Sequence, residues 1–463
     1  MSPASPTEAR SSMEPGTPQP PAASPPRAAG AAPGGASRDA LAGRLASLDV
    51  FRGLVILAML VVNNLGDHRV VGYWWKHADW RPVDLGADLR TWWTATGELS
   101  EGAKWAAGGS SQAADAVFPL LWHCTLADFV MPWFMLIIGV AMPFSVAAAR
   151  ARGPLGVGYW LRVLRRGATL YVLGWVLGLS LQFLFWRFSR DPSAKLVFTL
   201  GMDVLQLLGV SYVLSRVLYA LPGGAWVRLA AGLALLAWHW AFLKFLPQGE
   251  VPAGTFTARD NAVAYAYRHW AVFQTIELLP WLKLSFAGML SAVPAAGTML
   301  LGAWAGDVLR RDGTWRKLGL LAAVAAAWTV GGVLWSLDVP MNKPRWSSGY
   351  LLYCSGVGML VLVAIYVVVD VWRQRWWTWP VVALGVNAIG IYFLSILGKI
   401  WLLNMPKVVL ADGTVRMFTQ HLVAVLQGWL GPAAGSWAFT FGFVAVVWAL
   451  AMLAYARRWV WKV

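Results

Sequence analysis

The sequence predicts an all-α membrane protein, a polytopic bundle of about ten to eleven transmembrane helices. Of its 463 residues, 58% are hydrophobic, only 13% are charged and 31 are tryptophan. Soluble globular domains contain about 25% charged residues. The mean hydropathy of +0.55 also indicates a membrane protein.

Apolar segments long enough to cross a bilayer recur along the chain, since a span needs about 20 mainly apolar residues. Ten segments qualify: 48–66, 126–148, 165–186, 199–220, 227–246, 286–309, 317–336, 349–370, 381–402 and 436–456. Within 403–435, the stretch "HLVAVLQGWLGPAAG" fits either a half-helix that re-enters the membrane or an eleventh span.

The charge of the connections predicts the orientation. The net charge is +16, and Arg and Lys gather after the second, fourth, sixth and eighth segments and after the last one. Because cytoplasmic loops are enriched in these residues, both termini are predicted to be cytoplasmic. The same distribution argues against nucleic-acid binding.

Residues 1–43 are rich in Pro, Ala, Gly and Ser and lack apolar periodicity. Such a segment cannot bury enough apolar surface to offset its ordering entropy, so we expect a disordered cytoplasmic tail before a membrane domain over 44–463. The first apolar run begins near Leu48 and is long enough to span, so no signal peptide is expected.

Polar residues within apolar segments are candidates for function because they are costly in a bilayer. Asp49 and Arg52, three residues apart, fit a structural ion pair or part of a cofactor site. Asn63 and Asn64 end the first segment, and Asp128 begins the second. All three fit helix caps. Alternatively, the amides could stabilise an oxyanion and the aspartate could orient an imidazole.

Further polar residues have plainer interpretations. Asp203 and Gln206 lie one turn apart in the fourth segment and could line the same cavity. Asn387 is expected to make an interhelical hydrogen bond, and His239, in "AWHWAF", to be packed or interfacial. No His, Cys and carboxylate spacing resembles a metal site, so no metal is predicted.

Several blocks in order resemble the heparan-alpha-glucosaminide N-acetyltransferase family of transmembrane acyltransferases. The first three are "RLASLDVFRGLVILAMLVVNNLGD", "KHADW" and "TLADFVMPWFMLIIGVAMPFS". "VLQLLGVSY", "LSAVPAAGTMLLGAWAG", "PMNKPRWSSGYLLYCSG" and "WPVVALGVNAIGIYFLS" follow. The resemblance extends from about residue 44 to past 400.

The resemblance implies transfer of an acetyl group from cytosolic acetyl-CoA to an amino-sugar or other glycan acceptor across the membrane. The family's catalytic histidine, in the first non-cytosolic loop, matches His77 in "KHADW". Asp128 matches the aspartate that opens the next span, and Asn64 or Asn63 the amide before the loop.

The chain departs from the family pattern in this loop. His77 and Asp128 are 51 residues apart, whereas the family keeps them close, so an insertion over about 81–121 is predicted. His123 lies only five residues before Asp128 and is the alternative catalytic histidine. The context "KHADW" favours His77.

The other implied sites lie on opposite membrane faces. The anionic phosphates of CoA would meet the basic cytoplasmic side, where the cofactor candidates include Arg52, Arg165 and Arg166, with Asp49 and Gln206 as further members. Arg165 and Arg166 equally fit topology determinants. The acceptor candidates are Asn342, Lys343, Arg345 and Trp346 in "MNKPRWSSGY", together with Asn387. Interfacial anchoring is the alternative for this loop.

Two other classes fit the same composition. One is a transporter or flippase of a glycan, lipid or small solute, and the other is a structural member of an envelope complex. Broken helices and inverted repeats would favour the transporter. In all three cases the expected location is the lipid bilayer of a bacterial inner membrane, and a homodimer is a further expectation.

Overall fold

A computed structural model describes residues 45–72, 75, 124–189, 191, 193–249, 251–256 and 261–461. The chain divides into two units, Met1–Arg44 and Leu45–Val463, and the described residues belong to the second. The expected tail over 1–43 and the expected insertion over 81–121 lie outside the described residues.

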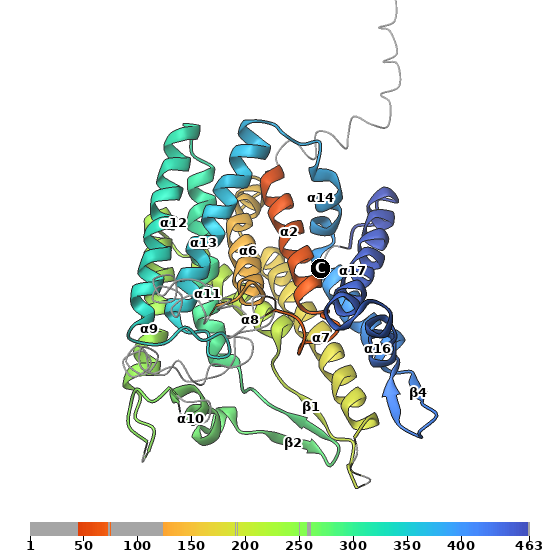
Figure 1. Ribbon diagram of the computed structural model, residues 1–463. Coiled ribbons are helices and arrows are strands. Elements are labelled where there is room, and N and C mark those ends of the chain that lie inside the picture. The colour runs from red at the N-terminus through yellow and green to blue at the C-terminus, as the bar shows by residue number, and fades with distance from the viewer. Residues whose placement is uncertain are drawn as a thin grey trace, which may run out of the picture. The chain divides into compact units, whose positions relative to one another are not determined.

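The membrane unit is a bundle of helices (Figure 1). Its longer helices are α2 (Ala46–Val62), α6 (Leu126–Arg150), α7 (Val157–Arg187), α8 (Val204–Ala220), α9 (Ala225–Phe245), α11 (Ala292–Leu309), α12 (Thr314–Ser336), α13 (Ser348–Tyr366) and α17 (Pro432–Ala456). Shorter ones are α10 (Ala262–His269), α14 (Thr378–Val386), α15 (Ala388–Gly398) and α16 (Phe418–Leu430). Two π-helical turns, η4 (Val367–Val371) and η5 (Lys399–Asn404), continue α13 and α15, and two 3₁₀ turns, η2 (Ala271–Phe273) and η3 (Met289–Ser291), precede α11.

Each of the ten predicted apolar segments contains helix, which confirms the all-α polytopic class. Within the described residues, seven helices are long and apolar enough to cross a membrane, or eight if the bent pair α14 and α15 counts as one span. Helices α2 and α8 have 17 residues each, a length of about 26 Å that is near the lower limit for a span. The full count of ten stays a prediction.

The ninth segment is broken. Helix α14 and the continuous stretch Ala388–Asn404 meet at an angle of 76°. Asn387 lies at the break and binds the C-terminal backbone: its Nδ2 donates to the Trp459 carbonyl at 2.8 Å, and its Oδ1 accepts from the Trp461 amide at 2.8 Å. Asn387 is hydrogen-bonded, but its partners lie beyond the end of α17, so the bond is not the interhelical one that was predicted.

The segment 403–435 forms a hairpin and a short helix. Strands β4 (Lys407–Val409) and β5 (Val415–Met417) pair antiparallel, and α16 follows with 13 residues. At about 1.5 Å per residue, α16 is roughly 20 Å long, too short for an eleventh span. The segment thus contains a short helix, and its re-entry into the membrane stays a prediction.

The strands gather at one end of the bundle, which we call the strand-bearing end (Figure 1). A second sheet there has the order β1-β3-β2, from Phe198–Leu200, Leu282–Leu284 and Ile276–Leu279, with β1 and β3 parallel. The connection between α12 and α13 also lies at this end. These are the connections that the charge distribution predicts to face outward.

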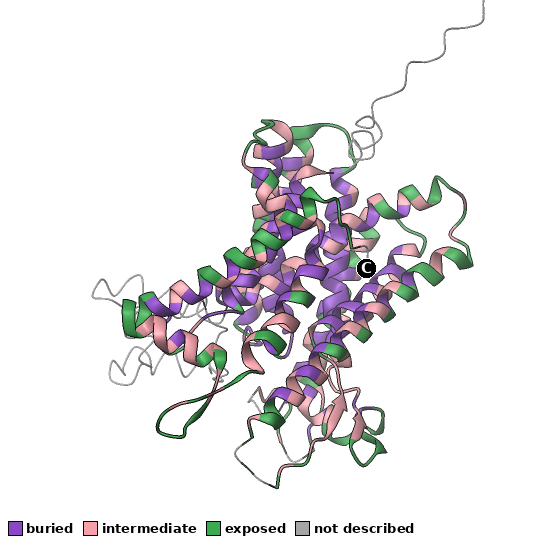
Figure 2. Cartoon of the chain, turned by 90° about the vertical axis from the view of Figure 1, so that its right-hand side faces the viewer, coloured by how far each residue is buried: buried purple, intermediate pink, exposed green. Residues whose placement is uncertain are grey.

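Burial separates a central helix from peripheral ones (Figure 2). In the most apolar stretch of the helix that includes α11, 83% of the residues are buried. In the corresponding stretch of α17, only 22% are buried. Peripheral helices expose large apolar side chains such as Val172, Leu450 and Leu453, as expected for surfaces solvated by lipid.

Glycines allow the central helices to approach closely. A Cβ atom added at Gly139 of α6 would lie 2.1 Å from the Met299 carbonyl oxygen, and one added at Gly302 of α11 would lie 2.3 Å from the Leu136 carbonyl oxygen. Small residues at such crossings let two backbones touch, as is common in membrane bundles. This contact fixes α6, which carries part of the cavity described next.

Candidate active site

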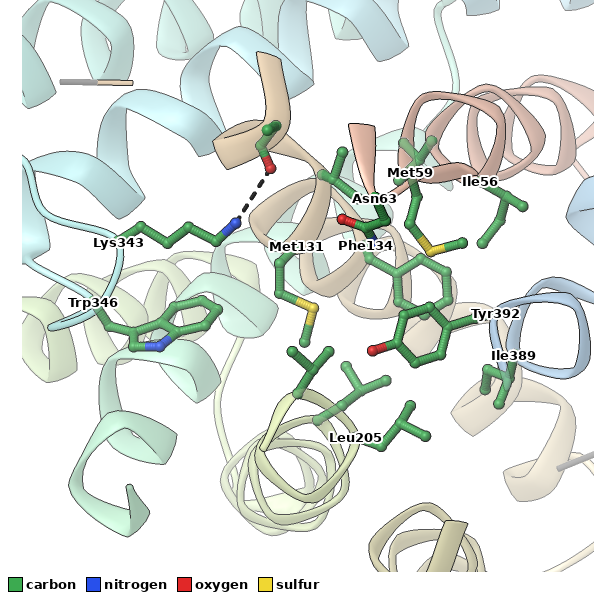
Figure 3. Close-up of a pocket in the computed structure, with 15 residues that line it drawn as sticks. Ile56, Met59, Asn63, Met131, Phe134, Leu205, Lys343, Trp346, Ile389 and Tyr392 are labelled. Carbon is green, nitrogen blue, oxygen red and sulfur yellow. Dashed lines mark hydrogen bonds between the residues drawn. The ribbon is translucent and has the colours of Figure 1, made fainter. Parts of the chain in front are cut away.

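A cavity of about 130 Å³ lies between four helices (Figure 3). Helices α2, α6, α8 and α15 form its walls, and the connection between α12 and α13 closes one side. The lining residues are Val55, Ile56, Met59, Asn63, Ala127, Val130, Met131, Phe134, Val204, Leu205, Leu208, Lys343, Trp346, Ile389 and Tyr392.

Helical spacing explains how each wall contributes. Ala127, Val130, Met131 and Phe134 follow the i, i+3, i+4, i+7 pattern of one face of α6. The residues from α2 and α8 recur at similar intervals. One face of each helix therefore meets the cavity, and most of the lining is apolar.

An ion pair lies beside the cavity. The Nζ atom of Lys343 is 3.4 Å from Oδ1 of Asp128. It also donates to the Ala127 carbonyl at 3.3 Å, the dashed line in Figure 3. Asp128 is 1% exposed. Burial lowers the pKa of Lys343, and the nearby Asp128 carboxylate opposes that shift.

Asp128 also caps α6. Its Oδ2 accepts from the Thr125 amide at 3.2 Å and from Thr125 Oγ1 at 3.0 Å. The Tyr350 hydroxyl donates to the Asp128 carbonyl at 2.6 Å. The capping interpretation of Asp128 is therefore confirmed, and the contact with Lys343 is an additional feature that the sequence did not indicate.

The turn that carries Lys343 sends its side chains in two directions. Asn342 Oδ1 accepts from the backbone N–H of Arg345 at 3.1 Å. The backbone N–H of Asn342 donates to Ser347 Oγ at 2.9 Å. Trp346 has a φ of 55°, a left-handed conformation that is uncommon for a bulky residue. Lys343 and Trp346 point into the cavity (Figure 3).

Arg345 is held elsewhere. It is 5% exposed, and its Nη1 donates to the Phe256 carbonyl at 3.0 Å. Burial lowers its pKa to about 10. Its own carbonyl accepts from Nε2 of His239 at 2.9 Å, and His239 is fully buried as expected. Of the four acceptor candidates in this turn, the structure therefore brings Lys343 and Trp346 to the cavity, but not Asn342 and Arg345.

The two adjacent amides of α2 differ. Asn64 is 4% exposed, and its Nδ2 donates to the Leu60 carbonyl at 2.7 Å. Asn63 lines the cavity, and its side-chain amide has no hydrogen-bond partner among the described residues. Asn63 is thus the amide available to a ligand.

Asp203 and Gln206 lie at the start of α8, and neither is among the residues that line this cavity. Asp203 is the N-cap, its amide donates to Gln206 Oε1 at 3.1 Å, and Gln206 Nε2 donates to the Gly201 carbonyl at 3.3 Å. The apolar run before them forms β1 instead of a helical turn. Their neighbours Val204 and Leu205 line the cavity in their place.

At the opposite end of α2, Asp49 and Arg52 form the predicted ion pair, with Nη1 and Oδ1 2.9 Å apart. Nearby, the Ser47 amide donates to Asp370 Oδ2 at 3.1 Å, which ties α2 to the end of α13. On α7, Arg165 is exposed and Arg166 lies over the Tyr212 ring at 5.0 Å. None of the predicted cofactor residues lines the cavity.

The two candidate histidines, His77 and His123, lie outside the described residues. The residues that flank them are anchored: the Trp75 and Trp437 rings are 5.1 Å apart, and the buried Cys124 Sγ is 3.6 Å from Cys354 Sγ. The described chain resumes at Cys124, three residues before Ala127, which lines the cavity.

Sequence reasoning missed the walls supplied by α8 and α15, including Leu208, Ile389 and Tyr392. Their helical spacing shows a shared face but not which helix that face meets. Tyr350, which holds the Asp128 carbonyl, was also missed.

The fold and this site define a class: a polytopic helical membrane protein with an apolar cavity and an ionic cluster near one face. No family model matches the chain. The chain is 23% identical over 406 residues to human heparan-alpha-glucosaminide N-acetyltransferase, covering 76% of this chain and 53% of the relative. The mouse enzyme of the same name is 23% identical over 408 residues, covering 77% and 54%. The chain thus spans about half the length of these relatives, and it is similar to them as a distant homologue.

Proposed function

We propose that the protein is a membrane acetyltransferase that moves an acetyl group from cytosolic acetyl-CoA to an amino-sugar or glycan acceptor on the outer side. One observation carries the proposal: Asn63 and Lys343 face a cavity that is also lined by Ala127, four residues after His123 in the sequence. The distant homology to N-acetyltransferases supports the same reaction type.

The proposed step is an acyl transfer. The acceptor nitrogen or oxygen bonds to the acetyl carbon, and its proton passes to a neutral imidazole, His77 or else His123. The carbon–sulfur bond then breaks, and the thiolate takes up a proton to leave free CoA. An imidazole suits this task because its pKa lies near neutrality. In the alternative order the histidine is acetylated first: an imidazole nitrogen bonds to the acetyl carbon as the carbon–sulfur bond breaks and CoA leaves. The acceptor then takes the acetyl group, the bond to the imidazole breaks, and the acceptor proton passes to the released imidazole.

The polar residues have distinct proposed roles. The Asn63 amide and the Lys343 ammonium group would donate to the oxyanion that forms on the acetyl oxygen. Asp128 would hold Lys343 in place. The imidazole of the catalytic histidine could also take the position of the Lys343 ammonium group beside Oδ1 of Asp128. Trp346 offers an apolar ring for a sugar face.

The donor is proposed to dock by its phosphates on the cytoplasmic side. Arg52, held by Asp49, and Arg165 and Arg166 supply cationic groups that suit phosphates. Neither Gln206, which caps α8, nor Asn387, which binds the C-terminal backbone, has a free role in this proposal. The broken helix at Asn387 alone would suit a transporter, but the relatives favour the enzyme.

The test uses the purified full chain with radiolabelled acetyl-CoA and glucosamine as a probe acceptor. The proposal predicts acceptor-dependent transfer of label and stabilisation of the protein by acetyl-CoA, which at 100 times its Kd is about 2.7 kcal/mol. A chain that neither binds acetyl-CoA nor transfers label to glucosamine or to other amino sugars would refute the enzyme and favour the transporter.

A further inference from the structure

We propose that Cys124 and Cys354 form a disulfide bond on the outer side of the membrane, and that this bond joins the start of α6 to α13. The chain contains two cysteines in all, so neither has another partner within the chain. The inference goes beyond the proposed acyl transfer, because it requires only that these two residues lie on the outer side.

The position of the two sulfur atoms is the first argument. Cys124 and Cys354 are 230 positions apart in the sequence, yet their Sγ atoms lie 3.6 Å apart. Both are free thiols in the structure, and a bond of about 2 Å requires the sulfurs to approach by roughly 1.5 Å. Cys124 precedes Thr125, the N-cap of α6. The hydrogen bonds of the helix therefore do not hold Cys124 against such a shift.

The burial of the pair is the second argument. Cys124 is 3% exposed and Cys354 is fully buried, and both belong to the same apolar cluster. Exposed disulfides are the labile ones, whereas a buried bond is protected from reductants. The surroundings therefore suit a bond with a lasting structural role.

The compartment is the third argument. Helix α13 begins at Ser348, directly after the connection at the strand-bearing end (Figure 1), and the charge distribution predicts that this end faces outward. Disulfides form and persist outside the cytoplasm and are rare within it. Two packed thiols are the alternative, because free cysteine is often buried. In an oxidising compartment, however, two thiols in contact are readily converted to a disulfide.

The bond would join the two elements that hold Asp128. Cys124 is followed by Thr125, whose amide and hydroxyl donate to Asp128 Oδ2. Cys354 lies one turn after Tyr350, whose hydroxyl donates to the Asp128 carbonyl. A cross-link restrains the unfolded chain more strongly as the loop that it closes becomes longer, and this one would close a loop of more than half the chain.

The bond would form by thiol–disulfide exchange with a protein disulfide of the outer compartment. The thiolate of one cysteine attacks a sulfur of that disulfide, whose S–S bond breaks, and a mixed disulfide forms. The second cysteine then attacks the sulfur of the first and releases the oxidant as a dithiol. The two cysteines lose two electrons and two protons, and the oxidant gains them. Because both sulfurs are buried in the folded protein, the exchange takes place before α6 and α13 have packed.

The test counts thiols in the full chain, expressed in a bacterial host and denatured directly in N-ethylmaleimide, which blocks free thiols. The blocked chain is then reduced and treated with a maleimide-linked polyethylene glycol, which adds mass at each released thiol. The inference predicts two additions per chain, and a peptide pair linked through Cys124 and Cys354 in the mass spectrum of the unreduced protein. No addition would show that both cysteines were thiols and would overturn the inference. A dimer that disappears on reduction would place the bond between chains and would also overturn it.

Thermal midpoints give a second readout. Cys124→Ala and Cys354→Ala each break the whole bond, so the double variant should lose less than the sum of the two single losses. Losses that simply add would contradict the bond. Neither measurement uses an acyl donor or an acceptor, so the proposed function can fail while this inference holds, and the reverse.

Discussion

The ammonium group of Lys343 lies 3.4 Å from the carboxylate of Asp128, which joins the connection between α12 and α13 to the first turn of α6. Asp128 is almost fully buried and Lys343 partly so. Removing one member of such a pair leaves the other charge uncompensated, which is costly in a buried site. The pair therefore links the stability of this end of the bundle to the proposed chemistry.

We expect Lys343→Gln to lower kcat by about 10²-fold, the typical loss for an oxyanion donor. Asp128→Asn should lower both kcat and the thermal midpoint, because it removes the partner of Lys343 and weakens the cap of α6. A double-mutant cycle on kcat measures the coupling. If the two losses simply multiply in the double variant, the residues do not act as a pair.

The alkaline limb of the pH profile should report Lys343. Burial lowers its pKa below the usual 10.5, so kcat should fall as pH rises through that lowered value and the ammonium group loses its proton. Asp128 raises this pKa, so Asp128→Asn should move the limb to lower pH. An unchanged limb in both Asp128→Asn and Lys343→Gln would exclude Lys343 as the titrating group.

The adjacent amides form a matched pair of variants. Asn63→Ala should reduce kcat by about 10²-fold with little change in stability, because its amide faces the cavity. Asn64→Ala should lower the free energy of unfolding by about 1 kcal/mol, through loss of the bond to Leu60, and retain kcat. Rates and thermal midpoints of both variants test this, and a reversed pattern would assign the oxyanion role to Asn64.

The choice between the histidines can be made with single substitutions. His77→Ala should abolish transfer and leave stabilisation by acetyl-CoA intact, whereas His123→Ala should retain transfer. His269→Ala serves as control, because His269 is exposed on α10. Loss of transfer only in His123→Ala would place the base on the other side of the predicted insertion.

Local patterns sufficed for much of the fold. The length of each apolar run predicted ten helical segments, and the three-residue spacing of Asp49 and Arg52 predicted their ion pair. An apolar run does not show where a helix begins, however, because a strand can be equally apolar. For that reason the predicted fourth segment begins at residue 199, although α8 begins at Val204 and Asp203 is its N-cap.

The candidate site depended on contacts that no local pattern contains. Lys343 and Asp128 are 215 positions apart in the sequence, and Leu208 and Ile389 reach the cavity from different parts of the chain. Spacing shows that residues share a helix face but not which helices meet. The histidine came from the family resemblance alone, since in composition "GYWWKHADWRP" is only an aromatic interfacial stretch.

Transfer across a sealed membrane tests the central claim most directly. Proteoliposomes with glucosamine trapped inside would receive labelled acetyl-CoA outside, and the labelled sugar in the lumen would be measured over time. The proposal predicts that wild-type protein accumulates N-acetylglucosamine inside the vesicles and that His77→Ala does not. The contradicting result is an absence of labelled sugar in the glucosamine-containing lumen. It must be obtained with wild-type protein, in vesicles shown to contain both orientations of the protein.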